Sequence, residues 1–196
     1  MNIFTHLGIS RGIMAVIERN LGIKLDGVGF VLGNIKPDID PKLSSVPHLK
    51  NTVMDYVSSE IKSLLSMEDK IKNRCTREFS ERLGLITHYL SDFFCYAHSE
   101  YFKGNILKHC IYESKLSKYC RKNKVAAAEN IKKRITYIDT DLVSILRYID
   151  NMHNEYLNAG NKASCKRDMK YTMEMAASFC ISVIKSYISE EINTAA

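Results

Sequence analysis

The sequence predicts an all-α fold: a single domain of about seven helices around a metal cluster, spanning residues 1–196. Apolar residues recur every three or four positions almost throughout, which is the period of an amphipathic helix. No stretch of useful length alternates apolar and polar residues as a half-buried strand does. A chain of 196 residues is long enough for one substantial core and too short for two comfortable domains.

The first expected helix lies near the N-terminus. Ile9, Ile13 and Val16 share one apolar face at helical spacing. Asn20 and Gly22 follow this stripe, and such residues commonly end a helix. A second apolar segment, residues 28–32, comes next.

A long loop, or short turns of helix joined by loops, is expected between Gly33-Asn34 and Pro47. This stretch holds all three prolines of the chain. Long loops in compact domains are often functional. This one carries Asp38 and leads into His48.

The other helices are placed by their apolar period and by the turn residues between them. Gly104-Asn105 and Gly160-Asn161 supply turns. The helices are expected at residues 49–66, 69–82, 83–102, 106–122, 125–152 and 165–191.

Composition narrows the class of protein. No apolar run approaches the roughly 20 residues that span a bilayer, and the N-terminus lacks the pattern of a secretion signal. The six cysteines are scattered without a Cys-x2-Cys motif, which fits reduced thiols. We therefore expect a cytoplasmic protein, or a mature form whose leader has been removed.

The net charge of +6 comes largely from a basic run between residues 103 and 134. Such a run is usually a solvated helix face, but it would also attract an anionic phosphodiester or, transiently, an anionic membrane surface. The run lacks the interleaved aromatic residues that stack nucleic-acid bases, so nucleic acid is not expected as the primary partner. The sequence leaves the oligomeric state open.

Histidines and carboxylates form the most informative pattern. His88 and Asp92, and then His109 and Glu113, are each four residues apart, so each pair can lie on one helix face and hold one ion. His98 lies between the two pairs. Imidazole and carboxylate are the ligands of hydrolytic zinc sites.

An isolated helical histidine is more often a surface residue or a hydrogen-bonded core residue than a ligand. Here the surrounding helix is largely apolar, and burying these groups would cost several kcal/mol unless each is paired or ligated. The pattern therefore favours a metal site. His153, past the end of a long basic helix, is assigned no metal role.

The motifs together resemble the bacterial zinc-dependent phospholipase C family and, more distantly, the fungal single-strand nucleases of the same superfamily. The resemblance covers about the first 115 residues strongly. Its motifs are Thr5-His6, Gly33-Asn34-Ile35-Lys36-Pro37-Asp38, Pro47-His48, Ile86 to Phe94, Ala97-His98, and His109 to Glu113. It implies an all-helical domain with a three-zinc cluster in a cleft.

The resemblance also implies which residues bind each ion. One zinc would be held by Asp38, His48, His88 and Asp92. A second would be held by His98, His109 and Glu113.

A third zinc in the family is held by the counterpart of His6, by the carboxylate matching Asp92, and by the amine and carbonyl of an N-terminal tryptophan. This chain has no tryptophan. The chelating atoms are backbone atoms, so Met1 could supply them. Alternatively, the start of the chain is frayed and only two ions bind, so we expect two or three zinc ions per chain.

The leading functional hypothesis is a zinc-dependent phosphodiester hydrolase of phospholipase C type. Asp38, a carboxylate on a loop, is the expected base that orients or deprotonates the attacking water. The substrate would be a phosphodiester or phospholipid. We expect no C-terminal β-sandwich of the kind with which some toxins of the family grip membranes.

Two alternatives remain. The first is a nuclease or nucleotidase on the same scaffold; that branch has aspartate where this chain has Glu113, which favours the lipase. The second is a non-catalytic, metal-stabilised helical binding domain. A structural zinc needs only four closed ligands, so a larger ligand set argues against it.

Overall fold

The computed structural model describes residues 1–68, 71, 73–123 and 134–193, and side chains as far as residue 188. Over these residues it is helical, with one isolated bridge between Lys24 and Arg74 and no strand, which confirms the all-α prediction. The elements are α1 (Ile3–Leu21), α2 (Gly27–Ile39), α3 (Pro41–Ser44), α4 (Lys50–Leu65), α5 (Arg77–Asp92), the 3-10 turn η1 (Tyr96–His98), α6 (Ile106–Lys122), α8 (Leu142–Asn158) and α9 (Cys165–Asn193).

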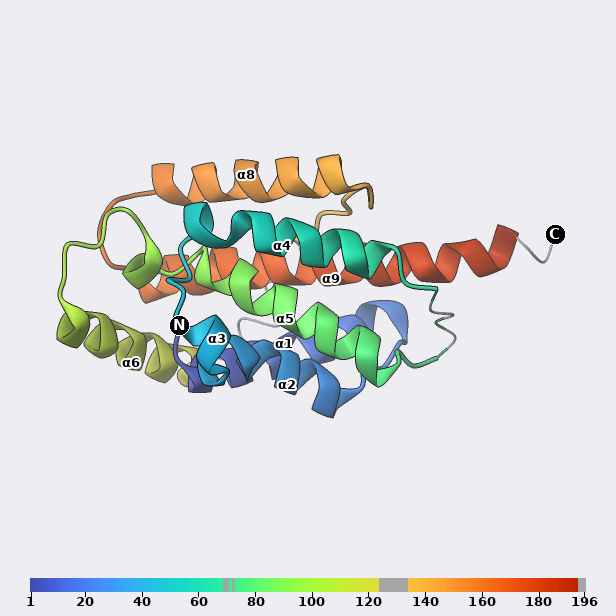
Figure 1. Cartoon of the computed structure of the whole chain (residues 1–196), viewed down its shortest axis with the longest axis horizontal. Coiled ribbons are helices and arrows are strands. Elements are labelled where there is room, and N and C mark those ends of the chain that lie inside the picture. The colour runs from blue at the N-terminus through green and yellow to red at the C-terminus, as the bar shows by residue number, and fades with distance from the viewer. Residues whose placement is uncertain (69–70, 72, 124–133, 194–196) are drawn as a thin grey trace.

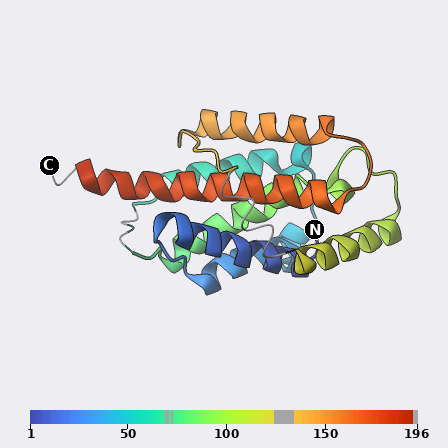
Figure 2. The ribbon, with the colours of Figure 1, turned by 180° about the vertical axis from the view of Figure 1, so that it is seen from behind.

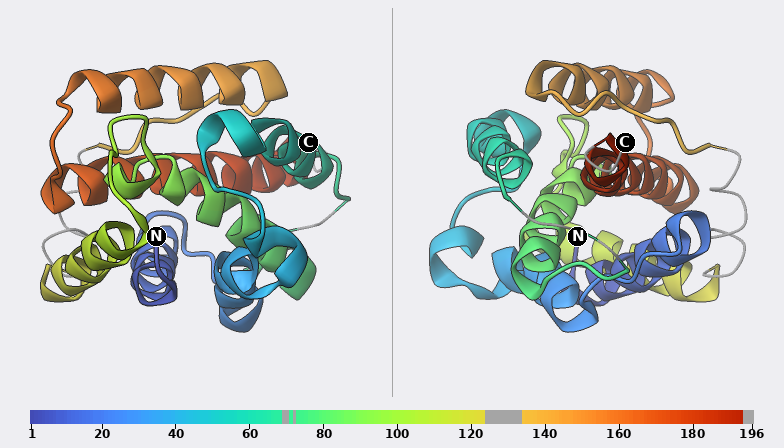
Figure 3. Two further views of the ribbon diagram at one scale, coloured as in Figure 1. Left: turned by 60° about the vertical axis from the view of Figure 1, so that its left-hand side comes forward. Right: turned by 90° about the vertical axis from the view of Figure 1, so that its right-hand side faces the viewer.

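Helix α9 runs the length of the molecule, with α8 along one side and α1 and α6 along the other (Figures 1 and 2). Helix α5 crosses the middle and packs against α2, α4 and α9. The two views in Figure 3 show α8 in an outer layer, α4 and α9 in the middle, and α1, α2 and α6 on the opposite side. The last turn of α5 therefore lies among the start of α1, the end of α2, the segment before α4, the turn η1 and the first turns of α6.

The closest packing joins α2 to α5. Gly33 on α2 lies against the backbone carbonyl of Glu81, and Gly84 on α5 lies against that of Phe30, so closely that a Cβ at either glycine would collide with backbone. These glycines let the two helix axes approach where a larger residue would separate them. The approach fixes the end of α2, with Asp38, beside the second half of α5.

The prediction for residues 33–47, a long loop or short turns of helix joined by loops, is therefore wrong in its first half. Helix α2 continues to Ile39 with Pro37 inside its last turn, and the short helix α3 follows. Gly33 serves helix packing here and does not end the helix. Pro37 has no N–H to donate to the carbonyl of Gly33, so it removes one helical hydrogen bond, and the helix ends two residues later.

The predicted division between helices 69–82 and 83–102 is also wrong. A single helix, α5, begins after Thr76, whose side chain accepts a hydrogen bond from the Phe79 N–H, and ends at Asp92. Gly84, at the expected division, is one of the packing glycines. Residues 69, 70 and 72 lie outside the described part of the chain.

Elsewhere the predicted helices lie close to the observed ones. Helix α6 has the predicted limits, α1 ends at a left-handed Gly22 (φ 69°), and α4 and α9 differ from prediction by a residue or two. In the predicted helix 125–152, residues 134–141 are not helical and α8 extends beyond to Asn158, while residues 125–133 are not described. No described helix combines the length and apolarity needed to cross a membrane.

Candidate metal centre

Side chains from six parts of the fold meet at the C-terminal end of α5. Their donor atoms form three groups, in each of which the atoms lie within 4.8 Å of one another. Two groups share His88, and we call their members together the inner cluster: His6, Asp38, His48, His88 and Asp92. We call the third the outer group: His98, His109 and Glu113.

All nine residues predicted as metal ligands lie in or against this centre, including Met1. Helix α1 brings His6, the end of α2 brings Asp38, and the segment before α4 brings His48. Helix α5 contributes His88 and Asp92, η1 contributes His98, and α6 contributes His109 and Glu113. Ligation of an ion by these residues remains a proposal.

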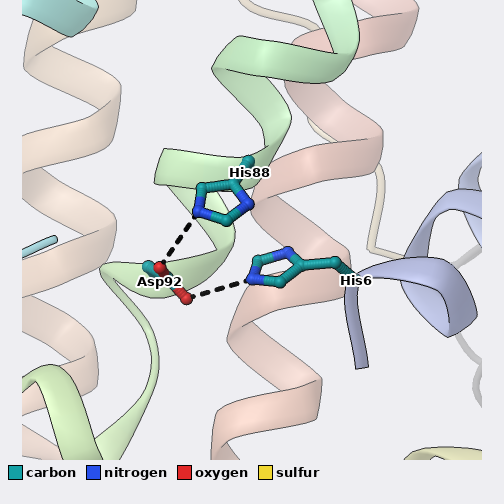
Figure 4. A group of neighbouring side chains, drawn as sticks. All are labelled: His6, His88 and Asp92. Atoms are coloured by element: carbon teal, nitrogen blue, oxygen red, sulfur yellow. Dashed lines mark ion pairs between the residues drawn. The ribbon is translucent and has the colours of Figure 1, made fainter. Parts of the chain in front are cut away.

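Asp92 lies at the centre of the contacts. Its Oδ1 accepts a hydrogen bond from the Met1 ammonium and lies 3.3 Å from His6 Nε2. Its Oδ2 lies 3.0 Å from His48 Nδ1 and 3.4 Å from His88 Nε2. Figure 4 shows His6 and His88 pointing at this carboxylate from two helices. Burial raises the pKa of Asp92, but the surrounding positive groups hold it well below its usual value.

One hydrogen bond fixes the tautomer of His88. Its Nδ1 lies 2.8 Å from the backbone carbonyl oxygen of Asn34 on α2. A carbonyl can only accept, so Nδ1 carries the proton and a neutral His88 presents the lone pair of Nε2 to the cluster. Histidines that bind metals commonly donate their other ring N–H to a carbonyl in this way.

His48 is oriented in the same manner. Its Nε2 lies 3.4 Å from the carbonyl oxygen of Leu43, so Nδ1 of the neutral ring faces inward. This Nδ1 lies 3.1 Å from His88 Nε2 and 3.0 Å from Asp92 Oδ2. Three acceptor lone pairs then converge, which is favourable only if a positive charge lies among them. In the ion-free chain a proton can supply that charge: burial lowers the pKa of His48, and the Asp92 hydrogen bond and charge raise it above its usual value.

Unpartnered polar atoms also mark the inner cluster. His6 is fully buried, and its Nε2 lies 3.3 Å from Asp92 Oδ1 without forming a hydrogen bond. Within the described chain, neither ring nitrogen of His6 nor Oδ2 of Asp38 has a hydrogen-bond partner. Unpartnered buried polar atoms are costly. Zinc ions would use one ring nitrogen of His6 and a carboxylate oxygen of Asp38, so the donor set fits that metal, although the second ring nitrogen of His6 would stay without a partner.

The outer group is linked through one carboxylate oxygen. Oε1 of Glu113 lies 2.8 Å from His109 Nε2 and 3.0 Å from His98 Nε2. Burial raises the pKa of Glu113, but these two hydrogen bonds outweigh it and hold the pKa far below its usual range. Two imidazoles and a carboxylate are a common ligand set for zinc.

The amine of Met1 lies between the inner cluster and the outer group. It bonds to Asp92 and lies 3.0 Å from His98 Nε2 and 3.4 Å from Glu113 Oε1. Burial lowers its pKa, but Asp92 and the other negative groups raise it to about 11. Met1 is only 3 % exposed, so the start of the chain is not frayed, while the number of ions stays a prediction. The Asn2 side chain, which accepts a hydrogen bond from the Thr5 N–H, caps α1 and sets this position.

Sequence reasoning missed two residues that support the centre: Asn34, which acts through its backbone carbonyl, and Asp168 on α9, whose carboxylate is bonded to residues beside the outer group. A carbonyl leaves no mark in a sequence, and a single aspartate in a helix forms no pattern. His153, which was assigned no metal role, contacts the rings of Phe94 and Tyr156 and belongs to none of the three groups.

Comparison with known proteins gives one family. A family model described as zinc dependent phospholipase C matches residues 5–163, which include every residue of the inner cluster and the outer group. No curated protein and no solved structure matches the chain.

Proposed function

The chain belongs to the zinc-dependent phospholipase C family, and we propose that it hydrolyses phosphodiesters, with phospholipids cut on the glycerol side of the phosphate as its substrates. The observation that carries this proposal is the convergence of His48 Nδ1, His88 Nε2 and Asp92 Oδ2, three inward-facing acceptors 3.0–3.4 Å apart. Such a site is built for cations.

The ligand sets follow from the groups of donor atoms. The inner cluster would hold one zinc through Asp38, His48, His88 and Asp92, and the outer group a second. A third would take the amine and carbonyl of Met1, with His6 and Asp92 completing its ligands. When bound, zinc polarises phosphate oxygens and activates water as a nucleophile.

Asp38 is the proposed base. Its side chain is 18 % exposed, whereas those of His88 and Asp92 are fully buried, so Asp38 is the carboxylate of the inner cluster that solvent reaches. Its Oδ2 is itself buried and lacks a hydrogen-bond partner within the described chain, so it can accept a proton while the other carboxylate oxygen would bind zinc. Asp38 would orient the attacking water and take its proton.

Turnover of three substrates tests this function: a chromogenic phosphocholine ester, bis-nitrophenyl phosphate and single-stranded DNA. We expect hydrolysis of the phosphocholine ester that stops with chelator and returns with zinc. Asp38→Asn should lose most of that rate and keep its zinc better than His88→Ala does. Preference for DNA would favour the nuclease alternative, and no turnover of any substrate would favour a non-catalytic binding domain.

A further inference from the structure

Asp168 is a buried carboxylate that the proposed chemistry does not use. It lies on α9, one turn from the helix start, and is 0 % exposed. Its Oδ2 accepts hydrogen bonds from the Tyr96 N–H (2.8 Å) and the Tyr112 hydroxyl (2.7 Å), and its Oδ1 accepts one from the Tyr156 hydroxyl (3.0 Å). A carboxylate is buried this way only where donors compensate for the lost water.

The two partners of Oδ2 adjoin the outer group. Tyr96 begins η1, which ends at His98 two residues later. Tyr112 immediately precedes Glu113 on α6. One oxygen atom therefore joins the two segments that carry the outer group. Oδ1 instead faces Tyr156 on α8, which contributes nothing to the metal centre, and lies 3.8 Å from Nε of Arg167 on α9 itself.

The short turn needs such a tether. The 3-10 turn η1 has three residues and no side-chain cap, so its own hydrogen bonds hold it weakly. His98 and Glu113 do contact each other, but an ion bound between them would replace that contact. The distance between the two segments would then depend on their other connections, and the Asp168 bridge is one that a bound ion leaves in place.

We propose that Asp168 is a positioning residue for the outer group, holding His98 and Glu113 at the separation that zinc requires. The inference rests on the proposed function, since it presumes that the outer group binds zinc. It extends the site beyond the family match, which ends at residue 163. The helix that follows the matched segment would then set the geometry of ligands within it.

A matched set of variants tests the proposal. Tyr112→Phe removes one bond to Oδ2, Tyr156→Phe removes the bond to Oδ1, and Asp168→Asn removes the charge. Zinc affinity is measured by chelator competition, and the outer group is followed by visible absorption after cobalt substitution. We expect Asp168→Asn and Tyr112→Phe to weaken zinc binding about tenfold, near the lower end for residues that orient ligands. Tyr156→Phe should bind as wild type even where it melts earlier.

Two results would overturn the proposal: wild-type affinity in Tyr112→Phe and Asp168→Asn, or an equal loss in Tyr156→Phe, which would indicate general loosening. If Asp168→Asn does not fold, the two tyrosine variants decide the matter. A Glu113→Gln background adds a control, because Asp168→Asn should cost no further zinc there. A wild-type chain that binds no zinc would instead contradict the proposed function itself.

Discussion

At the scale of single residues, hydrogen bonds to the backbone decide what the centre can bind. The Asn34 carbonyl fixes the tautomer of His88, and the Leu43 carbonyl orients His48. Both rings then turn a lone pair toward Asp92. The identity of these residues could be predicted from their spacing and from the family resemblance. Their tautomers could not, because each depends on a backbone carbonyl, that of Asn34 in α2 or that of Leu43 in α3, whose position only the fold determines.

Removing one inward-facing ring should empty the site. His88→Ala leaves Asp92 and His48 buried without the ring that contacts both, and breaking a buried charged network costs on the order of 3–5 kcal/mol. We expect zinc content to fall and the melting temperature to drop, and the same for His109→Ala. The control is His153→Ala, a histidine outside the centre, which should keep its zinc. Wild-type zinc content in both His88→Ala and His109→Ala would contradict the ligand assignment.

His6 should make the metal-free protein sensitive to acid. Burial, with the neighbouring His88 adding to it, lowers the pKa of His6 to about 3, whereas an unfolded histidine titrates near 6.5. Between these values the unfolded chain binds a proton that the folded chain does not. Stability is therefore fully present above about pH 6.5 and is lost as the pH falls toward 3.

Denaturant unfolding in excess chelator between pH 7 and pH 4 measures this slope. His6→Asn should show a shallower decline than wild type, because the group that gains the proton on unfolding is gone. Parallel curves for the two proteins would show that His6 does not govern the acid sensitivity.

At the scale of elements, the contact between α2 and α5 positions the inner cluster. The sequence predicted α6 well because Asn105, which caps it, and the apolar period agree. It failed at α2 because Gly33 and Pro37 look like residues that end a helix. Whether a glycine breaks a helix or packs it against another depends on the neighbouring helix, which only the tertiary structure supplies.

Gly33→Ala tests this contact. A Cβ at Gly33 would collide with the Glu81 carbonyl of α5, so the helices must separate, at a cost of about 1–3 kcal/mol. Zinc affinity should fall as well, because Asp38 and the Asn34 carbonyl move with α2. Gly27→Ala is the matched control: its Cβ would meet only Met14 Sδ, at 3.7 Å. Equal stability of the two variants would show that the close approach is unimportant.

At the scale of the whole molecule, the centre brings together segments between residue 1 and residue 113. Helix α9 supports them through Asp168, which accepts a hydrogen bond from the Tyr96 N–H. The helical period alone predicted most of these segments, but it did not predict that they lie close together in space. The spacing of His88, Asp92, His109 and Glu113 indicated two local pairs, and the resemblance joined them into one site. The contribution of α9 depends on how the last helix packs, and nothing in its own sequence marks it.

The position of Met1 gives the last prediction. Its amine lies within hydrogen-bonding distance of Asp92 and His98, and Met1 is almost fully buried. The amine, whose pKa is raised to about 11, must lose its proton to bind zinc, so this ion should be the one most easily lost in acid.

Residues added before Met1 would convert the amine to an amide, which is a poor ligand, and would displace it. We expect such an extension to remove one zinc per chain and most of the activity, while an equal extension after Ala196 changes neither. Unchanged zinc content and turnover in the N-terminally extended chain would show that Met1 is not a ligand and that His6 and Asp92 serve the inner cluster alone.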